Sequence, residues 1–207
     1  AAIGTSRLLL AFAHANGWEG KTHADIAGAF LTADVPEDID PIYIRVPDGF
    51  PAYDKTGRRI LAYRLLKSLY GLRQAPRWFY DHLHALLIKY GFKQATCEPC
   101  LYTRDLGTSD AIILSVVVDD LLASACKTST IDKFRAQLAA DVKLSLFEEV
   151  RQYLGMHVVD TPMCLTIDQE DYIDRLLFRV TMTYCKACDT PMAEEDLQPA
   201  KDEDVLS

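Results

Sequence analysis

Positive charge is scarce in this sequence. Lys and Arg together number 22 against 30 Asp and Glu, so the formal net charge is -8 at pH 7. Because nucleic-acid-binding domains commonly carry a basic surface, this total argues against that class unless the charges are unevenly distributed. Glycine and proline are also few, at 10 and 9 of 207 residues. This composition excludes collagen-like, low-complexity and intrinsically disordered chains.

The sequence has no hydrophobic run approaching the roughly 18 residues that a membrane-spanning helix needs. Its first residues, AAIGTSRLLLAFAHANGW, lack the charged start and the cleavage site of a signal peptide. We therefore predict a soluble, intracellular, cytoplasmic chain with no membrane partner. A length of 207 residues is enough for one substantial domain with its own hydrophobic core.

The six cysteines include two CxxC pairs, Cys97 with Cys100 and Cys185 with Cys188. Two such pairs could close a tetrahedral zinc site. However, the pairs are far apart in the chain, and Cys100 begins an apolar, strand-like run. Buried thiols are therefore favoured over zinc ligands, and disulfides are not expected in a reducing compartment.

The charges are unevenly distributed. Residues 193–207 carry six acidic residues and one lysine, and we expect this acidic tail to be disordered. Between Lys55 and Tyr80, by contrast, there are seven basic residues and no Asp or Glu. Five aromatic residues are interleaved with these cations. This stretch is either an ordinary solvated face or a surface that tracks phosphates and stacks on bases.

Hydrophobic periodicity and turn residues predict a mixture of helices and strands. Helices are expected over 5–17, 76–90, from about 128 to beyond 138, and 168–180. Strands are expected over 23–27, 42–46, 60–66, 101–104, 111–118 and 121–126, with a hairpin of 150–159 and 163–167 joined at Thr161-Pro162. This order predicts an α+β fold with an antiparallel sheet and helices on one face.

Adjacent carboxylates at Asp119 and Asp120 stand between two apolar runs. Burying two like charges is costly, and a divalent cation bound by carboxylate oxygens, Mg²⁺ or Mn²⁺, would remove that cost. A plain β-turn is the alternative, because Asp favours turns. Asp25 also ends a predicted strand, so three carboxylates could meet around two metal ions, although spacing alone does not show that they do.

Six segments occur in the order seen in copia-type LTR-retrotransposon reverse transcriptases, which this chain resembles over residues 5–192. The segment YGLRQAPR is the most specific of them. The segments are Asp25 to Leu31 (DIAGAFL), Ile42 to Phe50 (IYIRVPDGF), Leu66 to Trp78 (LKSLYGLRQAPRW), Val117 to Asp120 (VVDD), Tyr153 to Met156 (YLGM) and Asp189 to Met192 (DTPM).

The resemblance implies a polymerase palm with partial fingers and a primer grip over residues 1–192, and only the start of a thumb. It further implies that Asp25, Asp119 and Asp120 are catalytic and bind two Mg²⁺ or Mn²⁺ ions, with the carbonyl of Ile26 as another ligand. The nucleotide site implied is Ile26, Ala29, Phe30 as a steric gate against a ribose 2′-hydroxyl, and Gln74. The nucleic-acid contacts implied are Arg64, Lys67, Tyr70, Arg73, Arg77, Tyr153, Leu154, Gly155 and Met156.

The activity implied is RNA-directed DNA polymerisation from a dNTP onto a DNA primer, on an RNA or DNA template. Integrase and RNase H domains of the same polyprotein are the implied partners, and a virus-like particle is the implied location if the element is active. A degenerate, non-catalytic remnant that binds nucleic acid or a protein is the alternative, and a two-metal nuclease ranks last. Val117 replaces the aromatic residue usual in the family, and the chain starts just before the segment that contains Asp25, so we expect the preceding fingers segment to be absent. We therefore expect a polyprotein fragment or a degenerate copy, with little processive synthesis by the chain alone.

Overall fold

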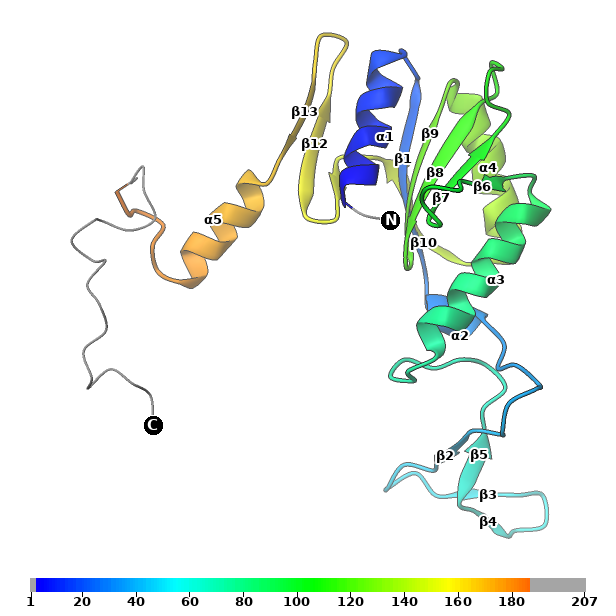
Figure 1. The fold of residues 1–207 in the computed structure, drawn as a ribbon. Coiled ribbons are helices and arrows are strands. Elements are labelled where there is room, and N and C mark those ends of the chain that lie inside the picture. The colour runs from blue at the N-terminus through cyan, green and yellow to red at the C-terminus, as the bar shows by residue number, and fades with distance from the viewer. Residues whose placement is uncertain (1–2, 187–207) are drawn as a thin grey trace, which may run out of the picture. The chain divides into compact units, whose positions relative to one another are not determined.

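A computed structural model describes residues 3–186 of the chain (Figure 1). The chain divides into two compact units after Asp168, which lies inside the predicted 1–192 segment. The units are described separately below. The DTPM segment, Cys188 and the acidic tail lie outside the described residues. No helix of the described part is long and apolar enough to cross a membrane.

A six-stranded antiparallel sheet is the centre of the first unit. The predicted antiparallel arrangement is therefore confirmed, and most of its strands lie close to their expected positions. The terminal strands β10 and β6 are additions to the prediction. The strand order is β10 (Leu144–Glu149), β1 (Gly20–Ile26), β9 (Asp120–Ala125), β8 (Ile112–Val117), β7 (Leu101–Arg104) and β6 (Lys93–Gln94).

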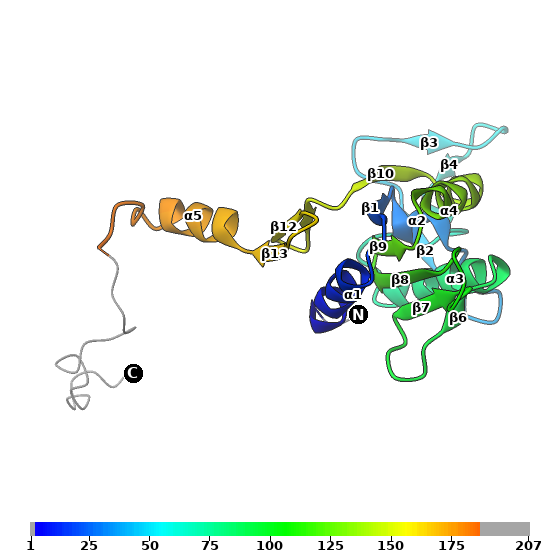
Figure 2. The same ribbon diagram turned by 90° about the horizontal axis from the view of Figure 1, so that it is seen from above.

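Helices cover both faces of this sheet, so the expectation that they lie on one face was wrong. Helices α3 (Ala75–Lys89) and α4 (Thr128–Asp141) bury Phe79 and Phe134 against residues such as Leu114. Helix α1 (Ile3–Ala15) packs on the opposite face, where its leucines meet Leu122. Figure 2 shows α1 on one side of β8 and β9 and the other two helices beyond them. A helical period predicts an apolar stripe but not which face of a sheet it covers.

A small three-stranded antiparallel sheet, made of two hairpins that share a strand, packs on the α1 side of the main sheet. The predicted strand over 150–159 is interrupted by a tight turn at Leu154 and Gly155, whose φ angles are 49° and 76°. The turn makes β11 (Gln152–Tyr153) pair with β12 (Met156–Asp160). Strand β12 pairs in turn with β13 (Leu165–Asp168), across the predicted turn at Thr161-Pro162.

Residues 35–66 form a projecting segment, called the arm here, that follows the short helix α2 (Ala29–Thr32). Its strands pair as two short hairpins, and Figure 1 shows it extending away from the end of the sheet near α2. The arm confirms the strands predicted near 42–46 and 60–66 and adds a second pair. The pairs are β2 (Tyr43–Arg45) with β5 (Ala62–Arg64), and β3 (Ala52–Tyr53) with β4 (Arg59–Ile60).

The described part of the second unit contains helix α5 (Glu170–Arg179), which confirms the helix predicted over 168–180. None of its residues is buried.

The cysteine thiols do not behave as the expected buried residues. Cys97, Cys164 and Cys185 are exposed, while Cys100 and Cys126 are half-buried, and all five are free thiols. Cys97 and Cys100 lie in the connection between β6 and β7, and connecting segments usually run over the protein surface.

Candidate active site

The sheet brings Asp25 and Asp120 directly opposite one another on adjacent antiparallel strands. Successive side chains of a strand point to opposite faces, and Ala24 and Ile26 point into the core beneath α3 and α4. Asp25 and its cross-strand partner therefore lie on the other face, at the end of the sheet where β1 ends. Both carboxylates are half-buried.

Asp119 lies in the two-residue connection between β8 and β9, after Val118. The backbone N–H of Ile26 donates to the carbonyl of Asp119 at 3.3 Å, which holds this turn beside the end of β1. The structure thus brings all three predicted aspartates to one end of three adjacent strands. Within residues 3–186, however, no three His, Cys, Asp or Glu side chains converge closely enough to form a metal site.

The turn carries backbone strain. Val118 has a φ of 57°, in a region that β-branched residues rarely occupy. Such a conformation costs on the order of 1–3 kcal/mol and persists only where the surrounding structure imposes it. The strained residue immediately precedes the paired aspartates.

Ser145, which the sequence did not single out, hydrogen-bonds to Asp25. The β1–β10 register shifts between Asp25 and Ile26, whose partners are Leu146 and Leu144, so Ser145 is the extra residue of a β-bulge. Its hydroxyl lies against the Asp25 carboxylate and 3.2 Å from the Asp25 carbonyl oxygen. Bulges commonly re-aim one side chain in this way. No sequence signal marks the serine, because the register depends on the paired strand.

His23 was also missed and contacts the other carboxylate. Its Nε2 lies 2.8 Å from Oδ1 of Asp120, and its ring packs edge-to-face on Tyr153 at a centroid distance of 5.2 Å. Tyr153 is 1% exposed, and its hydroxyl has no hydrogen-bond partner in the described part of the chain. Burial raises the pKa of this hydroxyl to about 12. A spacing of two residues from Asp25 on one strand is the signal that could have identified His23.

The predicted nucleotide-site residues gather beyond the end of β1. Gly28, at a φ of 63°, precedes α2 and turns the chain so that Ala29 is fully buried. Phe30 contacts Tyr70 with a ring-centroid distance of 4.7 Å, so the predicted gate residue and the YGLRQAPR segment meet. Gln74 precedes α3, and its carbonyl accepts the N–H groups of two residues in the first turn.

The basic stretch is free of acid in sequence but not in space. Lys67 pairs with Asp34 at 2.7 Å, and Arg77 pairs with Asp81 at 2.8 Å. Surface pairs of this kind contribute little to stability, so another anion can replace the carboxylate beside either cation. The remaining arginines of the stretch form no ion pair within residues 3–186: Arg58, Arg59, Arg64 and Arg73.

Of the four residues predicted to grip the primer, only two reach the surface. Tyr153 and Met156 are each 1% exposed and pack beneath α1. Leu154 is half-buried and Gly155 exposed at the tip of the turn. A contact between this hairpin and another molecule would therefore come from the turn.

Comparison with known proteins supports what these carboxylates and the antiparallel sheet suggest about the class. The family described as "Reverse transcriptase (RNA-dependent DNA polymerase)" matches residues 2–194. This chain belongs to that reverse transcriptase family, and its relatives place it in the copia-type branch.

The relatives are transposon proteins of plants and yeast. The Pol polyprotein from transposon TNT 1-94 of Nicotiana tabacum is 33% identical over 171 residues, covering 82% of this chain and 12% of that protein. The Pol polyprotein from transposon RE1 of Arabidopsis thaliana is 30% identical over 187 residues, covering 90% and 12%. A transposon Ty5-1 protein of Saccharomyces cerevisiae is 30% identical, covering 81% and 53%. The chain thus spans about an eighth of the plant polyproteins, at 12% of their length.

Proposed function

We propose that this chain is the catalytic segment of an RNA-directed DNA polymerase within a retrotransposon Pol polyprotein. The activity is transfer of a nucleotide from a dNTP to a primer 3′-hydroxyl on an RNA or DNA template. The observation that carries the proposal is the cross-strand pairing of Asp25 with Asp120, with Asp119 in the adjoining turn, in a chain of the reverse transcriptase family. Integrase and RNase H domains of the same polyprotein are the proposed partners.

The donor set of the site fits Mg²⁺ or Mn²⁺, two ions in the full reaction. Two half-buried carboxylates face one another, and each already accepts a hydrogen bond, from Ser145 and His23. Hard oxygen donors in such a pair favour a divalent cation that offsets their repulsion. The residues that would hold the ions are Asp25, Asp119, Asp120 and the carbonyl of Ile26. When bound, the ions lower the pKa of the primer hydroxyl and stabilise the leaving pyrophosphate.

The nucleotide is proposed to lie over the turn between β1 and α2. The aromatic pair of Phe30 and Tyr70 supports this placement, because it sets a rigid wall immediately after the strand that carries Asp25. A ring at this position crowds a ribose 2′-hydroxyl, so deoxynucleotides are preferred. Ala29, through its backbone, and Gln74, which is exposed immediately before α3, are proposed as further contacts to the nucleotide.

The nucleic acid is proposed to bind along the basic stretch and the hairpin turn. Arg64 and Arg73, which form no ion pair within residues 3–186, supply charge for phosphates, while exposed tyrosines supply stacking surfaces. Lys67 and Arg77 contribute through weak pairs that phosphate can replace. Leu154 and Gly155 are proposed to hold the primer end.

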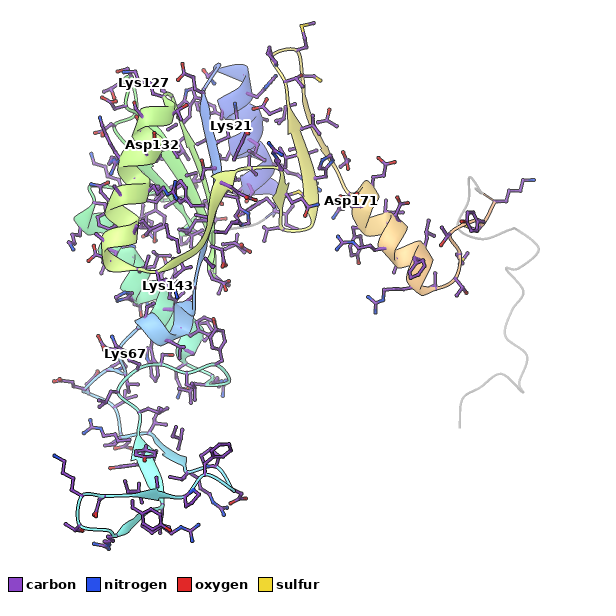
Figure 3. The ribbon with its side chains drawn as sticks, turned by 180° about the vertical axis from the view of Figure 1, so that it is seen from behind. Lys21, Lys67, Lys127, Asp132, Lys143 and Asp171 are labelled. Atoms are coloured by element: carbon purple, nitrogen blue, oxygen red, sulfur yellow. The ribbon has the colours of Figure 1, made fainter. Side chains whose placement is uncertain are left out.

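The experiment is primer extension on poly(rA)/oligo(dT) by a polyprotein segment that includes the flanking regions. Asp119→Asn is expected to lower kcat by at least about 100-fold, since a carboxylate ligand is lost. Asp132→Asn is the matched control, because it removes the same charge from an exposed position on α4. Figure 3 labels Asp132 on this helix, toward the end opposite to Lys143. Retained activity in Asp119→Asn would overturn the assignment.

A second candidate, a non-catalytic remnant that binds nucleic acid through residues 55–80, is favoured by Val117 and by the absence of a converged metal cluster in the described chain. Such a remnant would bind RNA with a steep dependence on salt. It would give no Mg²⁺-dependent dNTP binding, which the polymerase requires. Fluorescent dNTP titration with and without Mg²⁺ separates the two.

A further inference from the structure

His23 occupies a position between the two functional parts of the first unit. It lies two residues before Asp25 on β1, so both side chains share one face of the sheet. Its imidazole contacts Asp120 of β9 on one side and Tyr153 of the β11–β12 hairpin on the other. The side chain is only 14% exposed, so little solvent competes for these contacts.

The polar contact has a defined direction. An ionised carboxylate only accepts hydrogen bonds, so Nε2 of His23 carries the proton and donates to Oδ1 of Asp120 at 2.8 Å. One carboxylate oxygen of Asp120 is thereby fixed, while Oδ2 is left for another partner. This bond restricts the rotation of a side chain that is 31% exposed and would otherwise sample several rotamers.

The apolar contact determines where the imidazole lies. Tyr153 packs edge-to-face on the ring with an interplanar angle of 83°, and its own side chain is fixed beneath α1 together with Met156. An aromatic pair of this geometry holds both rings in place. The position of Asp120 therefore depends, through His23, on the hairpin that ends in the Leu154–Gly155 turn.

We propose that His23 is a positioning residue that orients Asp120 for the divalent cation and couples it to the β11–β12 hairpin. This inference rests on the proposed function. Residues that hydrogen-bond to metal-ligating groups usually contribute about 10–100-fold to metal affinity or activity. His23 acts on the affinity for the cation rather than on the chemical step, because it does not touch the reacting atoms.

The first test is binding of Mn²⁺ to the 207-residue chain, measured by electron paramagnetic resonance. His23→Leu keeps an apolar side chain but removes the donor, and we expect it to weaken Mn²⁺ about 10-fold. His23→Gln keeps an N–H donor and is expected to stay within about 3-fold of the parent chain. His82→Leu, on α3 over the opposite face, is the matched control and should bind as the parent does.

The outcomes separate this inference from the function on which it rests. If the parent chain binds no Mn²⁺, or binds it equally after Asp120→Asn, the proposed function fails and the inference fails with it. If the parent binds Mn²⁺, Asp120→Asn does not, and folded His23→Leu binds as the parent does, only the inference is overturned. Circular dichroism shows whether each variant is folded.

Two further measurements distinguish positioning from a purely structural role. In primer extension, His23→Leu should raise the Mg²⁺ concentration for half-maximal rate about 10-fold and leave kcat at saturating Mg²⁺ within about 3-fold. A structural role would lower kcat without moving the Mg²⁺ midpoint. Should His23→Leu not fold, nitrogen-15 NMR of the parent chain decides: Mg²⁺ should shift the His23 Nε2–H signal, and an unmoved signal would contradict the proposal.

Discussion

The end of the main sheet and the arm differ in how much of their structure is buried. Most positions of strands β8 and β9 are buried, whereas β2 and β5 are exposed throughout. Tightly packed strands therefore position the carboxylates. The cations and aromatic residues of segment 55–64 are instead carried by short, exposed hairpins. Catalysis requires groups held within fractions of an ångström, whereas a surface that follows a flexible strand of nucleic acid can adjust on binding.

Removing a ring from each region gives the largest expected contrast. Phe134 is fully buried, with its centroid 5.5 Å from that of Phe92, so Phe134→Ala should lower the free energy of unfolding by about 3–5 kcal/mol. Phe50 in the arm is 73% exposed, and Phe50→Ala should change it by less than about 0.5 kcal/mol. Urea denaturation followed by circular dichroism measures both. Similar losses would mean that the arm is packed as tightly as the sheet.

The ion cluster that holds the β12 strand against the sheet gives an intermediate effect. Asp160 accepts hydrogen bonds from Lys21 at 2.7 Å and from His14 at 2.8 Å. Burial alone would raise the pKa of the Asp160 carboxyl, but these two partners outweigh it and lower the pKa below its usual value. Asp160→Asn should therefore cost about 1 kcal/mol of unfolding free energy at pH 7, because Asp160 is exposed and solvent screens both pairs.

The pH dependence of this loss has a definite sign. Because the folded-state pKa of Asp160 is depressed, its contribution is complete above the unfolded-state value of about 3.9 and is lost as pH falls through the folded-state pKa. The difference between the parent and Asp160→Asn should therefore shrink at acidic pH. Asp132→Asn, at an exposed position on α4, should show no comparable difference at pH 7. A penalty of equal size at pH 3 would exclude the carboxylate as its origin.

The same contrast explains which features the sequence could predict. The aspartates were predictable because Asp119 and Asp120 stand between two apolar runs and Asp25 ends a predicted strand, whereas an edge strand is recognised only by alternation of apolar and polar residues. Strand β10 was missed because the bulge at Ser145 breaks that alternation: Leu144 and Phe147 pack toward α4, while Leu146 faces Asp25 across the strand pair. The contact of Ser145 with Asp25 likewise depends on a partner 120 residues away.

The arm was predicted less completely for a different reason. Its strands are two or three residues long, so they offer too few positions for a period of two to be recognised. The basic stretch is visible in the sequence, but Asp34, which pairs with Lys67, lies outside it. Pairing across the base of the arm is a tertiary property, and the composition of one segment carries no information about it.

Backbone strain at Val118 gives the smallest expected effect on the free energy of unfolding. In the arm, the residues with a positive φ are glycines, Gly49 and Gly57. At the candidate site, by contrast, the β-branched residue Val118 has a positive φ. Val118→Gly should relieve the strain and, after the added entropy of the unfolded chain, raise the unfolding free energy by about 0.5–1 kcal/mol. Val117→Gly, one residue earlier and in strand β8, should instead lower it by about 1 kcal/mol.

The functional consequence of Val118→Gly should have the opposite sign. A glycine loosens the turn that holds Asp119 beside Ile26, so the Mn²⁺ affinity of the chain should fall even as the chain becomes more stable. Thermal unfolding and Mn²⁺ binding of the same preparation measure the two quantities together. If the variant gains stability and keeps its Mn²⁺ affinity, the strain at Val118 does not serve the carboxylates; if both fall, the turn is not strained at all.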